Sequence, residues 1–243
     1  MRTILALHCL LASGASWRGL QEAMPDARLV CPDLPGHGAA TAWDPSGDFM
    51  DEAAAIAWAT APDGPFDLLG HSFGGCVALR MLADAPDRIR SLALVEPVMF
   101  AAGDRRVRAA NRAAMESVEA TLRAGDRDGA ARGFARLWGD GADWNTVPAR
   151  RRDYLSDRIH LLAAAGPGIV EDVHAILPRL PADPPPVTLV TRRNPPAIVA
   201  GIADGLRERI AGMRIVRIGS GHMIPMEAPG ALADVLRASL AEV

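Results

Sequence analysis

The stretch Leu68-Leu69-Gly70-His71-Ser72-Phe73-Gly74-Gly75-Cys76 decides how this chain folds. An apolar run over residues 66–69 leads into it and predicts a buried strand, and the apolar spacing after Ser72 predicts a helix that ends near Pro86. A G-x-S-x-G pattern between a strand and a helix is typical of a tight turn that displays the serine hydroxyl at the helix N-terminus. The glycines permit this turn, since a side chain there would strike neighbouring backbone. The alternative is a glycine-rich turn in which the serine is incidental.

The composition fits a globular domain. The chain has 243 residues, of which 49% are hydrophobic and 23% charged, so it can bury a sizeable core in one α/β domain with an insertion. The net charge of −3 and the lack of a basic patch argue against a nucleic-acid partner. The three cysteines form no C-x-x-C pair and are odd in number, which favours a reducing compartment over a disulfide framework.

Targeting and cofactor signals are absent from the sequence. Residues 1–3 run directly into a strand-like segment, and no apolar run is long enough to span a membrane. The sequence contains no H-E-x-x-H motif, no Walker loop and no G-x-G-x-x-G motif. We therefore expect a cytoplasmic monomer or homodimer that needs no metal or other cofactor and acts on a small molecule.

Short apolar segments alternate with helical patterns along most of the chain. The predicted strands are residues 3–7, 28–31, 66–69, 91–95, 187–191 and 214–218. This alternation predicts an α/β fold with a mostly parallel, doubly wound sheet that is covered on both faces.

One long segment breaks the alternation. Between Pro97 and Pro186 there are helical patterns and glycine breaks but no convincing strand. We predict a core of residues 1–99 and 178–243 and a helical cap of residues 100–177, inserted after the strand that ends at Glu96. Ordinary crossover helices are the alternative, but one crossover needs far fewer residues.

Four pieces of sequence, in this order, resemble the α/β-hydrolase superfamily. They are the loop at His8, Asp33-Leu34-Pro35-Gly36-His37-Gly38, Gly70-His71-Ser72-Phe73-Gly74-Gly75, and Gly219-Ser220-Gly221-His222. The resemblance covers nearly the whole chain and is closest to small capped bacterial hydrolases that cleave esters or related acyl compounds. It implies a serine nucleophile and an acyl-enzyme, and it implies that the rings of His8 and His37 brace backbone.

The resemblance assigns three kinds of role. Ser72 is the candidate nucleophile, and its weakly acidic hydroxyl needs a neighbouring base. His222, in a glycine-rich loop after the final strand, is the candidate base, and the chain order serine, acid, histidine fits. The backbone N–H groups of Phe73 and Leu10 are the candidate oxyanion hole, although Cys9 stands where the family usually has glycine.

The acid of the triad departs from the family pattern. The loop after the penultimate strand usually carries aspartate, but Asn194 stands there, and a neutral amide cannot offset an imidazolium charge. Glu96 ends the strand that follows the Ser72 strand, a position used for the acid in certain haloalkane dehalogenases. We predict that Glu96 is the acid. The alternative is that Glu96 binds backbone or an arginine of the cap.

Two further residues are candidates for substrate binding. His71 flanks the nucleophile and either touches substrate or packs, and Trp138 is a candidate for an apolar pocket wall. The leading hypothesis is a serine hydrolase of a carboxylic ester or related acyl bond. The same residues would serve a carbon–carbon bond hydrolase or a perhydrolase, and Asn194 motivates a non-catalytic ligand receptor on this fold.

Overall fold

A six-stranded sheet forms the centre of the molecule. The computed structural model describes residues 1–139 and 143–240. All paired strands run parallel, in the order β2-β1-β3-β4-β5-β6. The strands are β1 (Arg2–Leu7), β2 (Ala27–Val30), β3 (Phe66–His71), β4 (Ile89–Val95), β5 (Val187–Thr191) and β6 (Arg214–Arg217). The predicted doubly wound parallel sheet is confirmed, and every strand lies within two residues of its predicted bounds.

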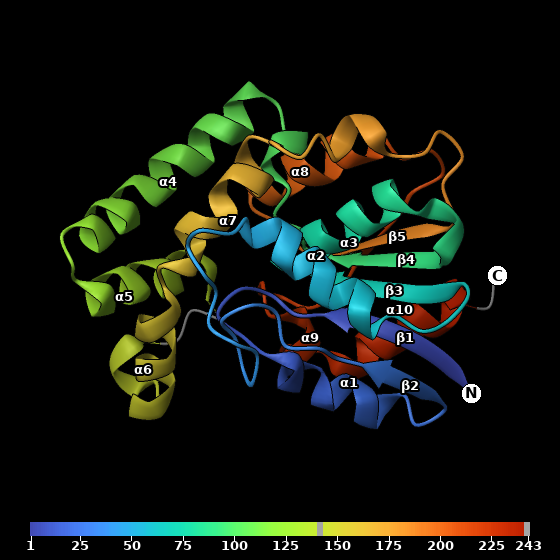
Figure 1. Cartoon of the computed structure of the whole chain (residues 1–243), viewed down its shortest axis with the longest axis horizontal. Helices are drawn as coiled ribbons and strands as arrows, with labels where there is room; N and C mark the ends of the chain where they lie inside the picture. Colours follow the sequence, from blue (N-terminus) through green and yellow to red (C-terminus); the bar gives the residue numbers. More distant parts are fainter. Residues whose placement is uncertain (140–142, 241–243) are drawn as a thin grey trace.

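Helices cover both faces of this sheet (Figure 1). One face carries α2 (Phe49–Thr60), α3 (Phe73–Asp84) and α8 (Ala197–Arg207), and the other carries α1 (Arg18–Ala23) and α10 (Pro229–Leu240). In β4, Leu92 and Leu94 join the core on the first face, whereas Ala93 and Val95 join the core on the second. Because successive side chains of a strand point to opposite faces, a sheet covered on both faces requires an unbroken apolar run.

The strand order reverses between β1 and β3. The chain moves outward from β1 to β2 and then returns to place β3 on the other side of β1. The loops that leave β1 and β3 therefore diverge and open a crevice at the carboxyl ends of the strands, which is where open parallel sheets bind ligands. Ser72 directly follows β3, so it lies at this crevice.

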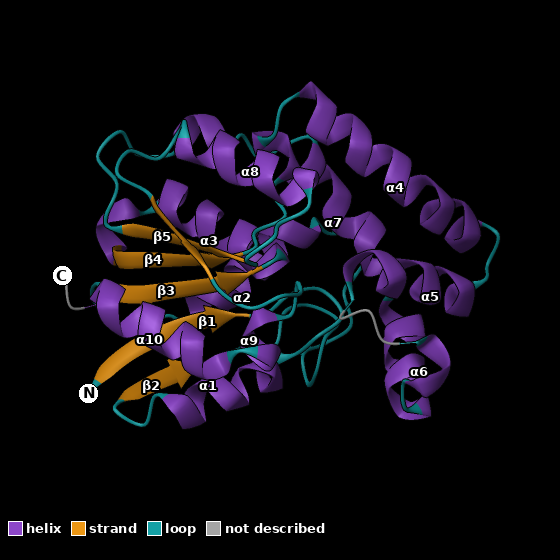
Figure 2. Cartoon of the chain, turned by 180° about the vertical axis from the view of Figure 1, so that it is seen from behind, coloured by secondary structure: helices purple, strands orange, loops and turns teal. Residues whose placement is uncertain are grey.

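In the described part of the segment between β4 and β5 there are four α-helices. They are α4 (Arg105–Arg123), α5 (Arg127–Trp138), α6 (Ala149–Arg158) and α7 (Leu161–Val170), and they lie off the carboxyl ends of the strands (Figure 2). Among the described residues of 100–177 there is no strand, as the pattern predicted. The division of the chain into core and cap remains a prediction. None of the helices in the described ranges is both long and apolar enough to cross a membrane.

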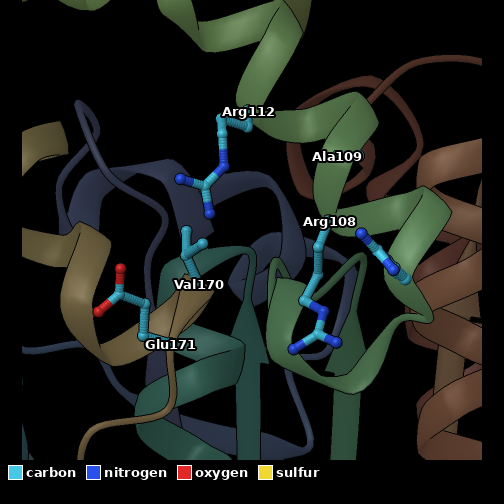
Figure 3. Close-up of a pocket in the computed structure, with 6 residues that line it drawn as sticks. Arg108, Ala109, Arg112, Val170 and Glu171 are labelled. Atoms are coloured by element: carbon cyan, nitrogen blue, oxygen red, sulfur yellow. The ribbon is translucent and has the colours of Figure 1, made fainter.

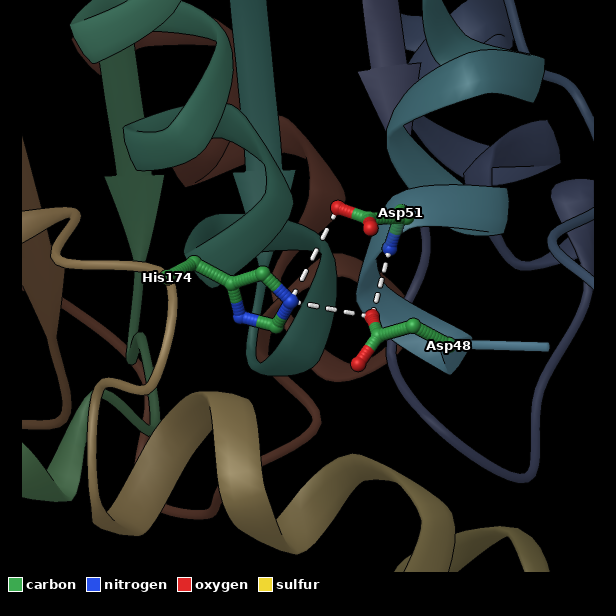
Figure 4. Close-up of side chains that lie close together, drawn as sticks. All are labelled: Asp48, Asp51 and His174. Carbon is green, nitrogen blue, oxygen red and sulfur yellow. Dashed lines mark hydrogen bonds and ion pairs between the residues drawn. The ribbon is translucent and has the colours of Figure 1, made fainter.

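A polar cluster fastens the end of this insert to α2 (Figure 4). The side chain of Asp48 caps α2 by accepting a hydrogen bond of 2.9 Å from the N–H of Asp51. Nε2 of His174, which follows α7, lies 3.0 Å from Oδ1 of Asp48 and 3.7 Å from Oδ1 of Asp51. The cluster thus links the chain after α7 to the helix that covers the sheet.

Candidate active site

Ser72 occupies a strained turn between β3 and α3. Its φ of 55° and ψ of −116° are unfavourable for a residue with a side chain. A Cβ at Gly74 would lie 2.2 Å from the carbonyl oxygen of Leu7, and one at Gly70 would lie 2.4 Å from the carbonyl oxygen of Gly74. The close approach of backbone therefore requires both glycines. The Ser72 N–H donates to the carbonyl of Val95 at 2.9 Å, which ties the turn to the end of β4.

His222 and Glu96 form a hydrogen-bonded line with Ser72. Nε2 of His222 lies 3.0 Å from Oγ of Ser72, and Nδ1 lies 2.9 Å from Oε2 of Glu96. All three residues are buried. Glu96 directly follows β4 and His222 lies in the loop after β6, so the ends of three strands supply the line. Asn194 is exposed in the loop after β5 and takes no part in it.

Arg192 holds the Glu96 carboxylate from the other side. Oε1 of Glu96 accepts hydrogen bonds from the backbone N–H of Arg192 at 2.8 Å and from its Nε at 2.9 Å, and Nη2 of Arg192 lies 2.5 Å from Oε2. Burial raises the pKa of Glu96, but the hydrogen bonds from His222 and Arg192 outweigh it and hold the pKa at about 2. Glu96 is therefore a carboxylate at neutral pH. The alternative for Glu96 was a bond to backbone or to an arginine of the cap. Glu96 does bind the backbone and guanidinium of an arginine, but this arginine, Arg192, directly follows β5, and Glu96 also binds His222.

Two side chains fix the loop that carries His222. Oε1 of Glu227 accepts hydrogen bonds of 2.8 Å from the backbone N–H groups of both Ser220 and Gly221. Nε2 of His71 donates to the carbonyl of His222 at 2.9 Å, and burial lowers the pKa of His71 to about 3. His71 is therefore neutral and braces the His222 backbone. This geometry favours packing over the substrate contact that we left open for His71.

The predicted oxyanion donors have no partner in the described parts of the chain. The N–H of Leu11 donates to Nε2 of His37 at 3.0 Å, whereas the N–H groups of Leu10 and Phe73 donate to no group in the described residues. Leu10 lines the same cavity as Ser72. The neighbouring Cys9 is buried, and burial raises its pKa to about 12, so its thiol stays protonated.

A cavity of about 110 Å³ lies over Ser72 and His222. Its walls are mostly apolar, and most of them come from the insert between β4 and β5: Phe100, Asn111, Met115, Glu119, Phe134, Trp138, Leu162, Gly166, Ile169 and Val170. The ring of Trp138 meets the ring of His222 edge-on, with 5.2 Å between centroids. Trp138 therefore lies in the wall of the cavity, and its contact with substrate stays a prediction.

The model of the alpha/beta hydrolase fold family matches residues 2–229. The chain belongs to this family. It is 28% identical to "Lipase LipV" of Mycobacterium tuberculosis over 255 residues, which cover 98% of the chain and 92% of the lipase. Over 85 residues it is 45% identical to a pimeloyl-[acyl-carrier protein] methyl ester esterase of Neisseria meningitidis, a match that covers 33% of the chain and 32% of that esterase.

Solved structures of the family share the fold. An alpha/beta hydrolase from Sphaerobacter thermophilus superposes with a TM-score of 0.72 and 21% identity, covering 98% of this chain and 92% of that one. At this level of identity the likeness concerns the arrangement of helices and strands, and the chemistry has to be argued from the side chains.

This alpha/beta hydrolase has a larger hollow than the cavity over Ser72. It has a volume of about 500 Å³ and lies between α4 and the end of α7 (Figure 3). Its lining is Arg105, Arg108, Ala109, Arg112, Val170 and Glu171. None of these side chains offers a hydroxyl or thiol nucleophile, whereas the smaller cavity contains Ser72 and shares only Val170 with this hollow.

Proposed function

We propose that the protein is a carboxylic-ester hydrolase that works through an acyl-enzyme, with Ser72 as nucleophile, His222 as base and Glu96 as acid. The observation that carries this proposal is the hydrogen-bonded line from Oγ of Ser72 through both ring nitrogens of His222 to Oε2 of Glu96. The names of the relatives, a lipase and a methyl ester esterase, support an ester as substrate.

Acylation follows from the position of each group. Oγ of Ser72 attacks the ester carbonyl while Nε2 of His222 takes the hydroxyl proton, and the carbonyl electrons move to the oxygen. The N–H groups of Leu10 and Phe73 donate to this oxyanion, each contributing about 3 kcal/mol to the transition state. The Glu96 carboxylate stabilises the imidazolium through Nδ1. His222 then gives its proton to the leaving alcohol as the carbon–oxygen bond breaks.

Deacylation repeats these steps with water. His222 takes a proton from a water molecule, and the hydroxide attacks the carbonyl of the acyl-serine. The proton returns to Oγ of Ser72 when the carboxylic acid leaves. Arg192 has no proton-transfer role in this cycle, because it contacts Glu96 rather than the reacting atoms.

The cavity limits the acyl group. Its volume of about 110 Å³ is below the roughly 150 Å³ of an engineered apolar cavity that accepts benzene. We therefore propose a short acyl chain of about two to four carbons, since that volume corresponds to a ligand no larger than benzene. Trp138 and Phe100, whose rings pack together, would contact this chain.

A panel of p-nitrophenyl esters from acetate to octanoate tests this function. We expect hydrolysis with kcat/KM highest for the short acyl groups, and no turnover by Ser72→Ala. An equal rate for that variant and the wild type would refute the mechanism. The carbon–carbon hydrolase and receptor alternatives predict little or no turnover of the panel, whereas a perhydrolase, which would use the same residues, would also release p-nitrophenol. The receptor hypothesis rested on the absence of a carboxylate at Asn194. The carboxylate of Glu96, which lies 2.9 Å from Nδ1 of His222, argues against it.

A further inference from the structure

Asn111 is a buried polar residue in the wall of the active-site cavity. It lies in the middle of α4, is 4% exposed, and lines the same cavity as Ser72 and His222. Its Oδ1 is buried and has no hydrogen-bond partner among the residues that the structure describes. Since nearly all buried polar atoms in proteins are paired, an unpaired one at a cavity wall needs a reason.

Packing gives no reason for an amide at this position. The other buried residues of α4, Val107 and Val118, are apolar and lie four residues before and seven residues after Asn111, on the same face of the helix. Most side chains that line the cavity around Asn111 are apolar too, among them Met115, Phe134 and Leu162. A leucine would suit this face of α4 better than a polar amide does.

The character of the unpaired atom indicates its ligand. A carbonyl oxygen only accepts hydrogen bonds, so a hydrogen-bond donor on the ligand would satisfy it. The other polar group that α4 gives to the cavity is the carboxylate of Glu119, which also only accepts and lies 3.8 Å from Arg123. This wall therefore suits a hydroxyl or an N–H group and disfavours a carboxylate.

We propose that Asn111 is a specificity-determining residue that selects a short acyl group carrying a hydrogen-bond donor, such as a hydroxyl. This inference rests on the ester hydrolysis proposed above and names its substrate class. The acyl carbonyl would sit at Ser72, and the acyl chain would extend from there into the cavity whose wall includes Asn111. A hydroxyl on this chain would pair with Oδ1 of Asn111. A plain alkyl chain would leave that atom unpaired, which a buried site penalises.

Two esters of nearly equal shape test the proposal. Ethyl 3-hydroxybutyrate and ethyl 3-methylbutyrate differ by a hydroxyl in place of a methyl group, and pH-stat titration follows the hydrolysis of each. For the wild type we expect kcat/KM to be at least about 10-fold higher for the hydroxy ester than for ethyl 3-methylbutyrate, using the enantiomer of the hydroxy ester that is hydrolysed faster. Asn111→Leu should lower this preference by at least about 10-fold, because the variant lacks the acceptor for the hydroxyl. The intrinsic reactivity of the two esters cancels when the ratio for the variant is divided by the ratio for the wild type. The exposed Asn145, changed to leucine as a matched control, should leave the ratio unchanged.

The outcomes separate this inference from the proposed function. A wild-type ratio at or below one, or an unchanged ratio in Asn111→Leu, overturns the role of Asn111 while ester hydrolysis itself stands. Failure of the wild type to hydrolyse these esters and p-nitrophenyl acetate overturns the proposed function and the inference with it. If Asn111→Leu does not fold, Asn111→Ala takes its place in the same measurement, and an unchanged ratio in that variant overturns the role of Asn111.

Discussion

Replacing Glu96 with glutamine removes the charge that faces His222 while keeping the shape of the side chain. In the wild type Nδ1 of His222 lies 2.9 Å from Oε2 of Glu96. Two unit charges at that separation attract by about 6 kcal/mol at an effective dielectric constant of about 20. Since each factor of ten in rate corresponds to about 1.4 kcal/mol, the loss of this attraction lowers kcat by about four orders of magnitude. Neutralisation of the acid in the serine-protease triad has an effect of the same size.

The same substitution also affects stability, because Arg192 loses its partner. The side chain of Arg192 is 14% exposed, and removing one member of a largely buried ion pair costs about 3–5 kcal/mol. The double variant Glu96→Gln, Arg192→Gln removes both charges. It should therefore recover part of the lost free energy of unfolding, but its kcat should stay low because the imidazolium still lacks a carboxylate.

Measurements of kcat on p-nitrophenyl acetate and of urea unfolding on both variants separate the two effects. Asn194→Ala is the control, and it should lower kcat by less than about 10-fold, because Asn194 is exposed and outside the hydrogen-bonded line. If activity returned together with stability in the double variant, the role of Glu96 would be structural. If Asn194→Ala lost more activity than Glu96→Gln, the assignment of the acid would be wrong.

Two further predictions concern stability. Gly74→Ala should destabilise the fold by several kcal/mol, because its Cβ would lie 2.2 Å from the carbonyl oxygen of Leu7. Gly230→Ala should be neutral or stabilise the fold by about 0.5–1 kcal/mol, since nothing lies within 4 Å of its Cβ. Equal urea midpoints for the two variants would contradict the close approach of Gly74 to the backbone of Leu7. Burial lowers the pKa of His71 and His37 to about 3, so the unfolded chain binds more protons below the ordinary histidine value of 6.5. The contribution of these two residues to stability should be complete above pH 6.5 and decline as the pH falls toward 3, and an unchanged thermal midpoint between pH 7 and pH 5 would count against their burial as neutral rings.

The sequence predicted the features that depend on local pattern. The strands were recognisable because burial on both faces demands continuous apolar runs, as in Leu92 to Val95. The brace predicted for His8 is present, since its Nε2 accepts a hydrogen bond of 2.9 Å from the N–H of Leu34. The position of Glu96 beside His222 could be predicted because the alternative, Asn194, cannot carry charge, whereas the role of Glu96 as the acid stays a prediction.

Features that depend on which loops meet in space were missed. Arg192 lies 96 positions from Glu96, and their contact follows from the pairing of β4 with β5. The bonds of Glu227 to the loop before His222 depend on how α9 (Ile224–Glu227) turns back, which spacing alone does not define. Asn111 gave no signal because a single asparagine in an arginine-rich helix resembles any solvated polar residue.

Covalent labelling by a fluorophosphonate tests whether Ser72 is an activated nucleophile, because the probe reacts only with a serine that its neighbours activate. Mass spectrometry of the digested protein locates the adduct. We expect one adduct per chain on Ser72, no adduct on Ser72→Ala, and a thermal midpoint for that variant close to that of the wild type. An unlabelled wild-type protein, or an adduct on another residue, would contradict this expectation.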